Sequence, residues 1–152
     1  MSKYSSINTD FDDQECLVEA LVQDGFQPVM AEDQIQGDNL IGYQGDTRKE
    51  RAHIILPRKQ VGGAANDIGF VRQPDGKFSA TISAFDQGAH GTKWLDKIRQ
   101  KFVVAKQMRT WKKEGYTEFE TVKNDDGGLT VKAKIPAQHA PVQQQAQVGF
   151  RR

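Results

Sequence analysis

The stretch DIGFVRQPDGKFSATISA, residues 67–84, decides the fold of this chain. Two segments rich in strand-forming residues, 67–72 and 77–84, flank the turn sequence QPDG. In such a turn proline presets φ, aspartate bonds back to the main chain, and glycine adopts a positive φ. Alternate residues of the second segment are apolar and share one face: Phe78, Ala80, Ile82 and Ala84. The stretch therefore predicts an antiparallel β-hairpin with one apolar face.

A helix is predicted on each side of this hairpin. Residues 12–24 carry apolar side chains at helical spacing behind three aspartates, which suit a helix N-terminus. Residues 92–114 form the second helix, with Thr92 as its expected N-cap. The apolar stripe of this second helix comprises Trp94, Leu95, Ile98, Phe102, Ala105 and Met108. Each helix ends in a glycine and an aromatic residue, Gly25-Phe26 and Gly115-Tyr116, which is typical of a left-handed C-terminal cap.

Short strands are predicted around these elements at residues 3–9, 26–30, 40–43 and 49–56, with a loop over 57–65. A second hairpin is predicted from segments 117–123 and 129–135, which alternate and are joined by NDDGG. This order favours an α+β fold, a two-layer sandwich of a mostly antiparallel sheet with two helices packed on one face. We expect one domain over residues 1–135. Residues 136–152 are rich in glutamine and poor in apolar side chains, which predicts a disordered tail.

The composition excludes several classes of protein. The chain has 152 residues, of which 37% are hydrophobic and 27% charged, and no apolar run is long enough to span a membrane. No segment at its start is typical of a secretory signal, so we expect a cytoplasmic protein, or a stromal one if it is encoded in a plastid. Cys16 is the single cysteine, which rules out a disulfide framework or a zinc site built from cysteines.

The residues that carry catalysis or bind metals do not form a recognisable pattern. His53, His90 and His139 are far apart and lack ligand spacing. There is no nucleophile elbow and no phosphate-binding loop, because the glycines after Arg58 and Lys59 lack the Gly-Lys-Ser/Thr sequence that opens a helix. We therefore predict no catalytic residue, no metal and no cofactor. An enzyme whose site is assembled from dispersed polar residues remains a third hypothesis.

Charge is distributed unevenly along the chain. Residues 1–46 carry ten acidic side chains and one basic, whereas residues 47–152 carry ten acidic and twenty basic. Either the two parts neutralise each other on folding, or the second part presents a cationic surface to a partner. The helix 92–114 concentrates this charge, with eight basic residues and one acidic residue between Lys93 and Lys113. The candidate partner-binding residues are Lys97, Lys101, Lys106, Arg109, Trp111, Lys112 and Lys113 of this helix, with Arg58 and Lys59 of the 57–65 loop.

These features favour a small non-enzymatic module that binds another protein within a larger assembly. The alternative is a nucleic-acid-binding protein that uses the same helix and loop, with Trp111 stacking on bases. Trp111 lies off the apolar stripe, so we expect it to be partly exposed. A membrane partner is not expected, because the apolar stripe is needed for the sheet. The sequence leaves the partner's identity and the oligomeric state open.

The order of these segments resembles a known family. Several stretches are similar to its characteristic ones: the opening MSKYSSINT, the strand AHIIL at 52–56, NDIGF at 66–70 followed by PDGKF at 74–78, and the part of the second helix from Trp94 through Phe102, running on to Gly115-Tyr116. The family is a conserved hypothetical reading frame of algal plastids and cyanobacteria, with relatives in other bacteria, and is a domain of unknown function. The resemblance covers about residues 1–135. It implies a small α+β domain of the cyanobacterial cytoplasm or plastid stroma and assigns no catalytic residue.

Overall fold

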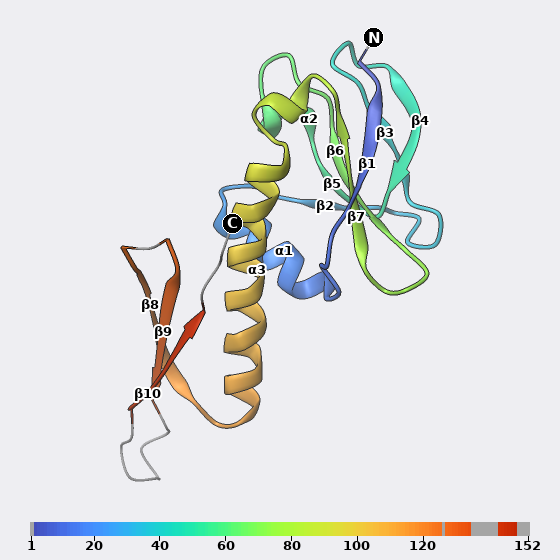
Figure 1. Cartoon of the computed structure of the whole chain (residues 1–152). Coiled ribbons are helices and arrows are strands. Elements are labelled where there is room, and N and C mark those ends of the chain that lie inside the picture. The colour runs from blue at the N-terminus through green and yellow to red at the C-terminus, as the bar shows by residue number, and fades with distance from the viewer. Residues whose placement is uncertain (1, 126, 135–142, 149–152) are drawn as a thin grey trace. The chain divides into compact units, whose positions relative to one another are not determined.

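The computed structural model describes residues 2–125, 127–134 and 143–148 (Figure 1). The chain divides into two compact units, Met1–Arg99 and Gln100–Arg152, where the sequence predicted one domain over 1–135. The long helix α3 (Thr92–Lys113) contributes residues to both units. Each unit is described by itself below.

The first unit is built on a five-stranded antiparallel sheet in the order β1-β7-β6-β5-β2. The predicted hairpin is confirmed as its centre, with Phe70 paired to Ala80 and the turn closed by a 2.9 Å hydrogen bond from the Gly76 N–H to the Gln73 carbonyl. The strands are β1 (Tyr4–Asn8), β2 (Val29–Met30), β5 (Ile54–Leu56), β6 (Ile68–Arg72) and β7 (Phe78–Ser83).

Helical segments cover one face of this sheet. The register aligns Ile54, Phe70 and Ala80, so these side chains share that face. Phe11, just before helix α1 (Gln14–Gln23), places its ring centroid 6.3 Å from that of Phe70, and Trp94 of α3 lies 6.4 Å from it. The mostly antiparallel sheet and its two main helices confirm the predicted α+β class.

A two-stranded hairpin covers the opposite face of the sheet and adds a layer that the sequence did not predict. Strands β3 (Asp38–Ile41) and β4 (Thr47–Ala52) bury Leu40 and Ala52 against Ile55, with Val71 packed beside them. Close approach is possible because Gly69 of β6 has no side chain. A Cβ atom at Gly69 would lie only 2.5 Å from the Cβ of Ala52.

The strand predicted over 49–56 is in fact two strands, β4 and β5, which belong to different sheets. They are separated at His53, a buried residue. Its Nδ1 accepts a 3.0 Å hydrogen bond from the Arg72 N–H, so Nε2 must carry the proton that it donates to the Ile35 carbonyl at 3.1 Å. This double anchoring fixes the chain where it passes from one sheet to the other. The expected loop at 57–65 also contains one helical turn, α2 (Arg58–Val61).

Both long helices end as the sequence predicted. Gly25 has a φ of 100°, and the Phe26 N–H donates to the Leu21 carbonyl at 3.0 Å. Gly115 has a φ of 96°, and the Tyr116 N–H donates to the Trp111 carbonyl at 3.0 Å. Both are Schellman caps, in which a left-handed glycine lets the next residue satisfy a carbonyl of the last turn. The start of α3 differs by one position, because Thr92 is its first helical residue and not its cap.

The second unit joins the later part of α3 to a three-stranded antiparallel sheet in the order β10-β9-β8. The predicted hairpin is confirmed as β8 (Thr117–Lys123) and β9 (Leu129–Lys134). Strand β10 (Gln143–Val148) lies in the segment expected to be a disordered tail, and it pairs with β9. Main-chain pairing needs no apolar side chain, which explains how a glutamine-rich segment forms a strand. Residues 136–142 and 149–152 of that expected tail lie outside the described residues.

The apolar surface of α3 changes face along the helix. The predicted stripe from Trp94 to Ala105 is buried and Met108 is half-buried, but Val104 and Trp111 are buried too. At about 100° per residue, Val104, Met108 and Trp111 form a second stripe of their own. These three residues pack in the core of the second unit with Tyr116, Phe119, Leu129, Val131 and Ala133.

We predict that replacing Gly69 with alanine destabilises the first unit. The added Cβ would have to displace the hairpin residues Ala52 and Leu40, which should lower the free energy of unfolding by about 1–3 kcal/mol. Gly63→Ala is the matched control, because a Cβ there meets nothing within 4 Å. Urea denaturation of both variants measures the effect. Equal stability of the two variants would contradict the close packing of the two layers.

Candidate functional site

The cationic residues predicted on α3 lie in different environments. Lys97, Lys112 and Lys113 are exposed. Lys101, Lys106 and Arg109 are half-buried and take part in contacts with other groups; the Nζ of Lys106, for example, lies 5.7 Å from the centroid of the Phe102 ring. The Nζ of Lys112 lies 5.8 Å from the centroid of the Phe119 ring. The exposed cations on this helix are therefore fewer than the sequence indicated.

The expectation that Trp111 is partly exposed is wrong. Its side chain is 8% exposed and packs in the core of the second unit, stacked on Phe119 with ring centroids 6.3 Å apart. The reason is the second apolar stripe of α3, to which Trp111 belongs. An indole in this position is not accessible to a nucleic-acid base, and base stacking was the feature that favoured nucleic acid.

Residues 1–46 neutralise α3 only in part within the first unit. The Nε of Arg99 lies 3.1 Å from Oδ2 of Asp10, and both side chains are about half exposed. Such an exposed pair contributes about 0–1 kcal/mol. Lys93 and Lys97 are also exposed and have no ion pair among the described residues of this unit. The acidic first part therefore leaves some cationic charge on the helix surface.

The other predicted cations, Arg58 and Lys59, lie on α2 beside a buried polar cluster that the sequence analysis missed. Four polar side chains form this cluster and are almost completely buried: Asn66, Asp67, Ser83 and Asp86. We call it the Asn66 node. Burial of polar groups is unfavourable unless each finds a hydrogen-bond partner, so the partners of this cluster decide its role.

Asn66 connects the β3–β4 turn with the end of β7. Its Oδ1 accepts a 2.9 Å hydrogen bond from the Tyr43 N–H, and its Nδ2 donates to Ser83 Oγ at 2.9 Å. Its own N–H donates to Oδ2 of Asp86 at 2.9 Å, and the Ser83 hydroxyl donates to that same oxygen at 2.8 Å. The Asp86 carboxylate, at the start of the short helix η1 (Asp86–Gly88), is thus held by neutral donors.

Asp67 connects the same node to β3 and α2. Its Oδ2 accepts from the Ile41 N–H at 2.8 Å, and its Oδ1 accepts from the Arg58 N–H at 2.7 Å, which caps α2. The Tyr4 hydroxyl donates to the Asp67 main-chain carbonyl at 2.7 Å. Burial raises the pKa of the Asp67 carboxyl, although its two main-chain hydrogen bonds oppose that rise. Burial and the nearby Asp67 also raise the pKa of Tyr4.

Two large aromatic side chains are exposed close to the Asn66 node. Phe85, next to Asp86, is 62% exposed, and Tyr43 is 40% exposed. A guanidinium nitrogen of Arg58, Nη1, donates to the Tyr43 carbonyl at 3.3 Å. No local sequence signal pointed to these two residues, because only the long-range hydrogen bonds of Asn66 bring their segments together.

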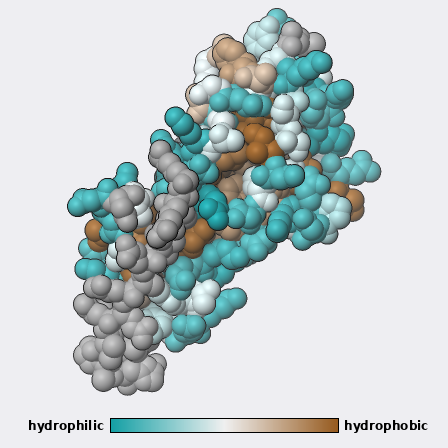
Figure 2. Space-filling model, in the orientation of Figure 1, coloured by the Kyte–Doolittle hydropathy of each residue, from teal (hydrophilic) through white to brown (hydrophobic). Residues whose placement is uncertain are grey.

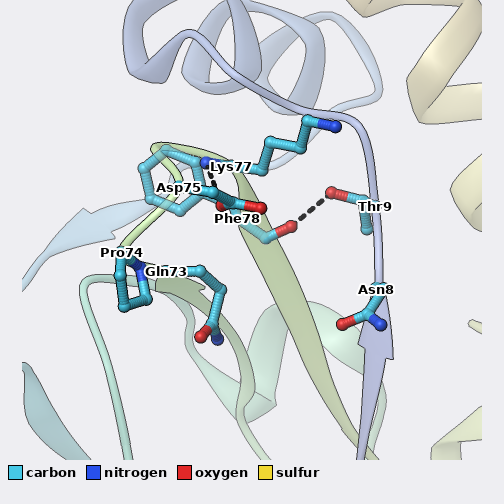
Figure 3. A pocket seen from close by; sticks show the side chains of 7 residues that line it. All are labelled: Asn8, Thr9, Gln73, Pro74, Asp75, Lys77 and Phe78. Carbon is cyan, nitrogen blue, oxygen red and sulfur yellow. Dashed lines mark hydrogen bonds between the residues drawn. The ribbon is translucent and has the colours of Figure 1, made fainter.

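A hollow on the first unit is lined by residues of the β6–β7 turn and the end of β1 (Figure 3). The Thr9 hydroxyl donates to the Phe78 carbonyl at 2.5 Å, and Asp75 accepts from the Lys77 N–H at 2.9 Å. No histidine lines this hollow. The described residues contain no group of three or more side chains that could hold a metal ion, and they include no helix long and apolar enough to cross a membrane.

We predict that Asn66→Ala strongly destabilises the first unit. The change removes the acceptor of the Tyr43 N–H and one of the donors to Ser83 Oγ, and it empties the space of a fully buried side chain. The expected loss is roughly 2–4 kcal/mol in the free energy of unfolding. Asn8→Ala, at an exposed asparagine, is the matched control and should change stability by less than about 0.5 kcal/mol. Similar denaturation curves for both variants would rule out a structural role for the node.

We also predict an acid-dependent loss of stability that depends on His90. Its ring packs edge-on against Trp94 and Phe26, and burial lowers its pKa, while the nearby Asp86 and Asp24 oppose this shift. The folded state therefore favours neutral His90, so its contribution is complete above pH about 6.5 and falls as the pH drops through the folded pKa. The difference in unfolding free energy between wild type and His90→Gln should shrink on acidification. A difference that stays constant with pH would contradict this assignment.

The comparisons with known proteins identify a family for this chain. The family model described as "Protein of unknown function (DUF1257)" matches residues 20–132. The comparisons with curated proteins and with solved structures gave no match. The match spans well over half of the chain, and it confirms the predicted resemblance to a domain of unknown function. The chain belongs to the DUF1257 family of proteins of unknown function.

Proposed function

We propose that this protein is a small non-enzymatic module that binds an acidic protein within a larger assembly. The observation that supports the proposal most is the state of the C-terminal end of α3, where Lys112 and Lys113 are exposed while the neighbouring Trp111 is buried. A helix that keeps its cations outside and its aromatic ring inside offers charge without a stacking surface.

This arrangement favours an acidic protein over a nucleic acid. Cations on a surface steer and align an acidic partner over a long range, and they need no aromatic neighbour to do so. Recognition of single strands usually combines basic residues with exposed rings on which bases stack. A solvated end of the helix is the simplest alternative, since lysines in a last turn also complement the helix dipole. The proposed compartment is the cytoplasm or a plastid stroma, as the family resemblance implies.

We predict that the double variant Lys112→Glu, Lys113→Glu loses its protein partner. The tagged wild-type chain is used to capture partners from its native lysate, with and without nuclease, and bound proteins are quantified by mass spectrometry. Charge reversal should reduce a nuclease-resistant partner by about tenfold or more, because the variant repels an acidic surface. The control is Lys3→Glu with Lys49→Glu, two exposed lysines of the first unit, and it should retain the partner.

Thermal melting of both variants shows that any loss of binding is not a loss of folding. Co-purification that disappears with nuclease would instead favour the nucleic-acid alternative. A partner that is retained equally by both variants would contradict the role of the α3 lysines.

A further inference from the structure

We propose that the end of the first unit beside α2 is a second docking surface, which binds an extended protein segment carrying an apolar side chain next to a carboxylate. We call it the α2 surface, and it comprises Tyr43, Arg58, Lys59 and Phe85. The inference adds a second surface to the proposed function and does not depend on the lysines of α3.

The two exposed rings supply the apolar part of this surface. Phe85 and Tyr43 are two of the large apolar residues that the first unit leaves exposed, at 62% and 40%. Aromatic side chains contribute strongly to protein interfaces, because each buries a large area with few rotatable bonds. Figure 1 places α2 at the end of the main sheet where β1 begins, and Figure 2 shows hydrophobic residues exposed at that end.

Hydrogen bonds hold the main chain at both rings. The Tyr43 N–H donates to buried Asn66, and its carbonyl accepts from Arg58. The Phe85 N–H donates to Ser2 Oγ at 2.9 Å, and the next residue, Asp86, belongs to the Asn66 node. A surface whose main chain is already ordered loses less conformational entropy when a partner binds. The Asn66 node therefore holds the main chain of the α2 surface in place, as supporting residues do in a preformed binding site.

Charge indicates the chemistry of the partner. Lys59 is exposed and has no ion pair among the described residues, and Arg58 uses only Nη1 of its guanidinium on the Tyr43 carbonyl. These two cations can bind a carboxylate. Two cations match a single carboxylate, whereas the run of phosphates in a nucleic acid calls for more cations than this surface carries. An acidic and apolar protein segment fits the α2 surface better than a nucleic acid.

The test selects binders from a random peptide library displayed on phage, using the full-length chain as bait. We expect enriched peptides to place aspartate or glutamate beside a large apolar residue. Phe85→Ser and Tyr43→Ser should each weaken binding of an enriched peptide by about tenfold, and Lys59→Glu should weaken it as well. Val29→Ser, at an apolar residue of β2 that is 50% exposed, and Lys49→Glu are the matched controls and should bind as wild type does.

Chemical-shift mapping on the wild-type chain needs no variant, so the misfolding of a variant cannot affect its result. Addition of the peptide should shift the amide signals of residues 43, 59 and 85. Absence of enrichment, or enriched peptides that bind all variants equally, would overturn the inference. So would a fluorescent oligothymidine that binds wild type and is lost in the Phe85 and Tyr43 variants, because that result assigns the surface to nucleic acid. None of these outcomes depends on the fate of the lysines on α3.

Discussion

The structure of the first unit depends on two adjacent polar residues, Asn66 and Asp67, that lie just before strand β6. Consecutive side chains of an extended chain point in opposite directions, so each of the two reaches different partners. Asn66 binds the β3–β4 turn and the end of β7, while Asp67 binds β3 and caps α2. Segments distant in sequence are thereby joined by hydrogen bonds to two side chains that are almost completely buried. Such a network stabilises one arrangement, because any other would leave several buried polar groups unpaired.

The surfaces proposed for binding consist of side chains that the two hydrophobic cores leave exposed. Helix α3 buries one apolar stripe that includes Trp94 and another that includes Trp111. Lys97, Lys112 and Lys113 of the same helix remain exposed. At the α2 surface, the Asn66 node occupies the interior and leaves Tyr43 and Phe85 exposed. In both places the buried residues determine which side chains a partner can reach.

Local sequence signals predicted the elements but not their connections. The 67–84 hairpin, the two long helices and their glycine caps depend on neighbouring residues, and the structure contains all of them. The division of the 49–56 strand at His53 depends on partners such as Arg72, which is 19 residues away. The Asn66 node is held by a side-chain bond across 17 residues to Ser83. The prediction that Trp111 is exposed was wrong because it assumed one apolar stripe on the helix, whereas the helix has two and contributes to the cores of both units. Of the candidate site, the sequence identified its cations but neither of the aromatic residues on the α2 surface.

Native-state hydrogen exchange tests the central role of the Asn66 node most directly. Among the main-chain N–H groups that donate to its side chains, four serve as probes: those of Ile41, Tyr43, Arg58 and Asn66. If the node holds the first unit together, these four amides exchange only through global unfolding, and their exchange rates give the free energy of that unfolding. The Lys77 N–H, which donates to Asp75 in an exposed turn, is the internal reference and should exchange far faster. Exchange of the four node amides as fast as that of Lys77 would show that the node opens independently, and would contradict this account of the fold.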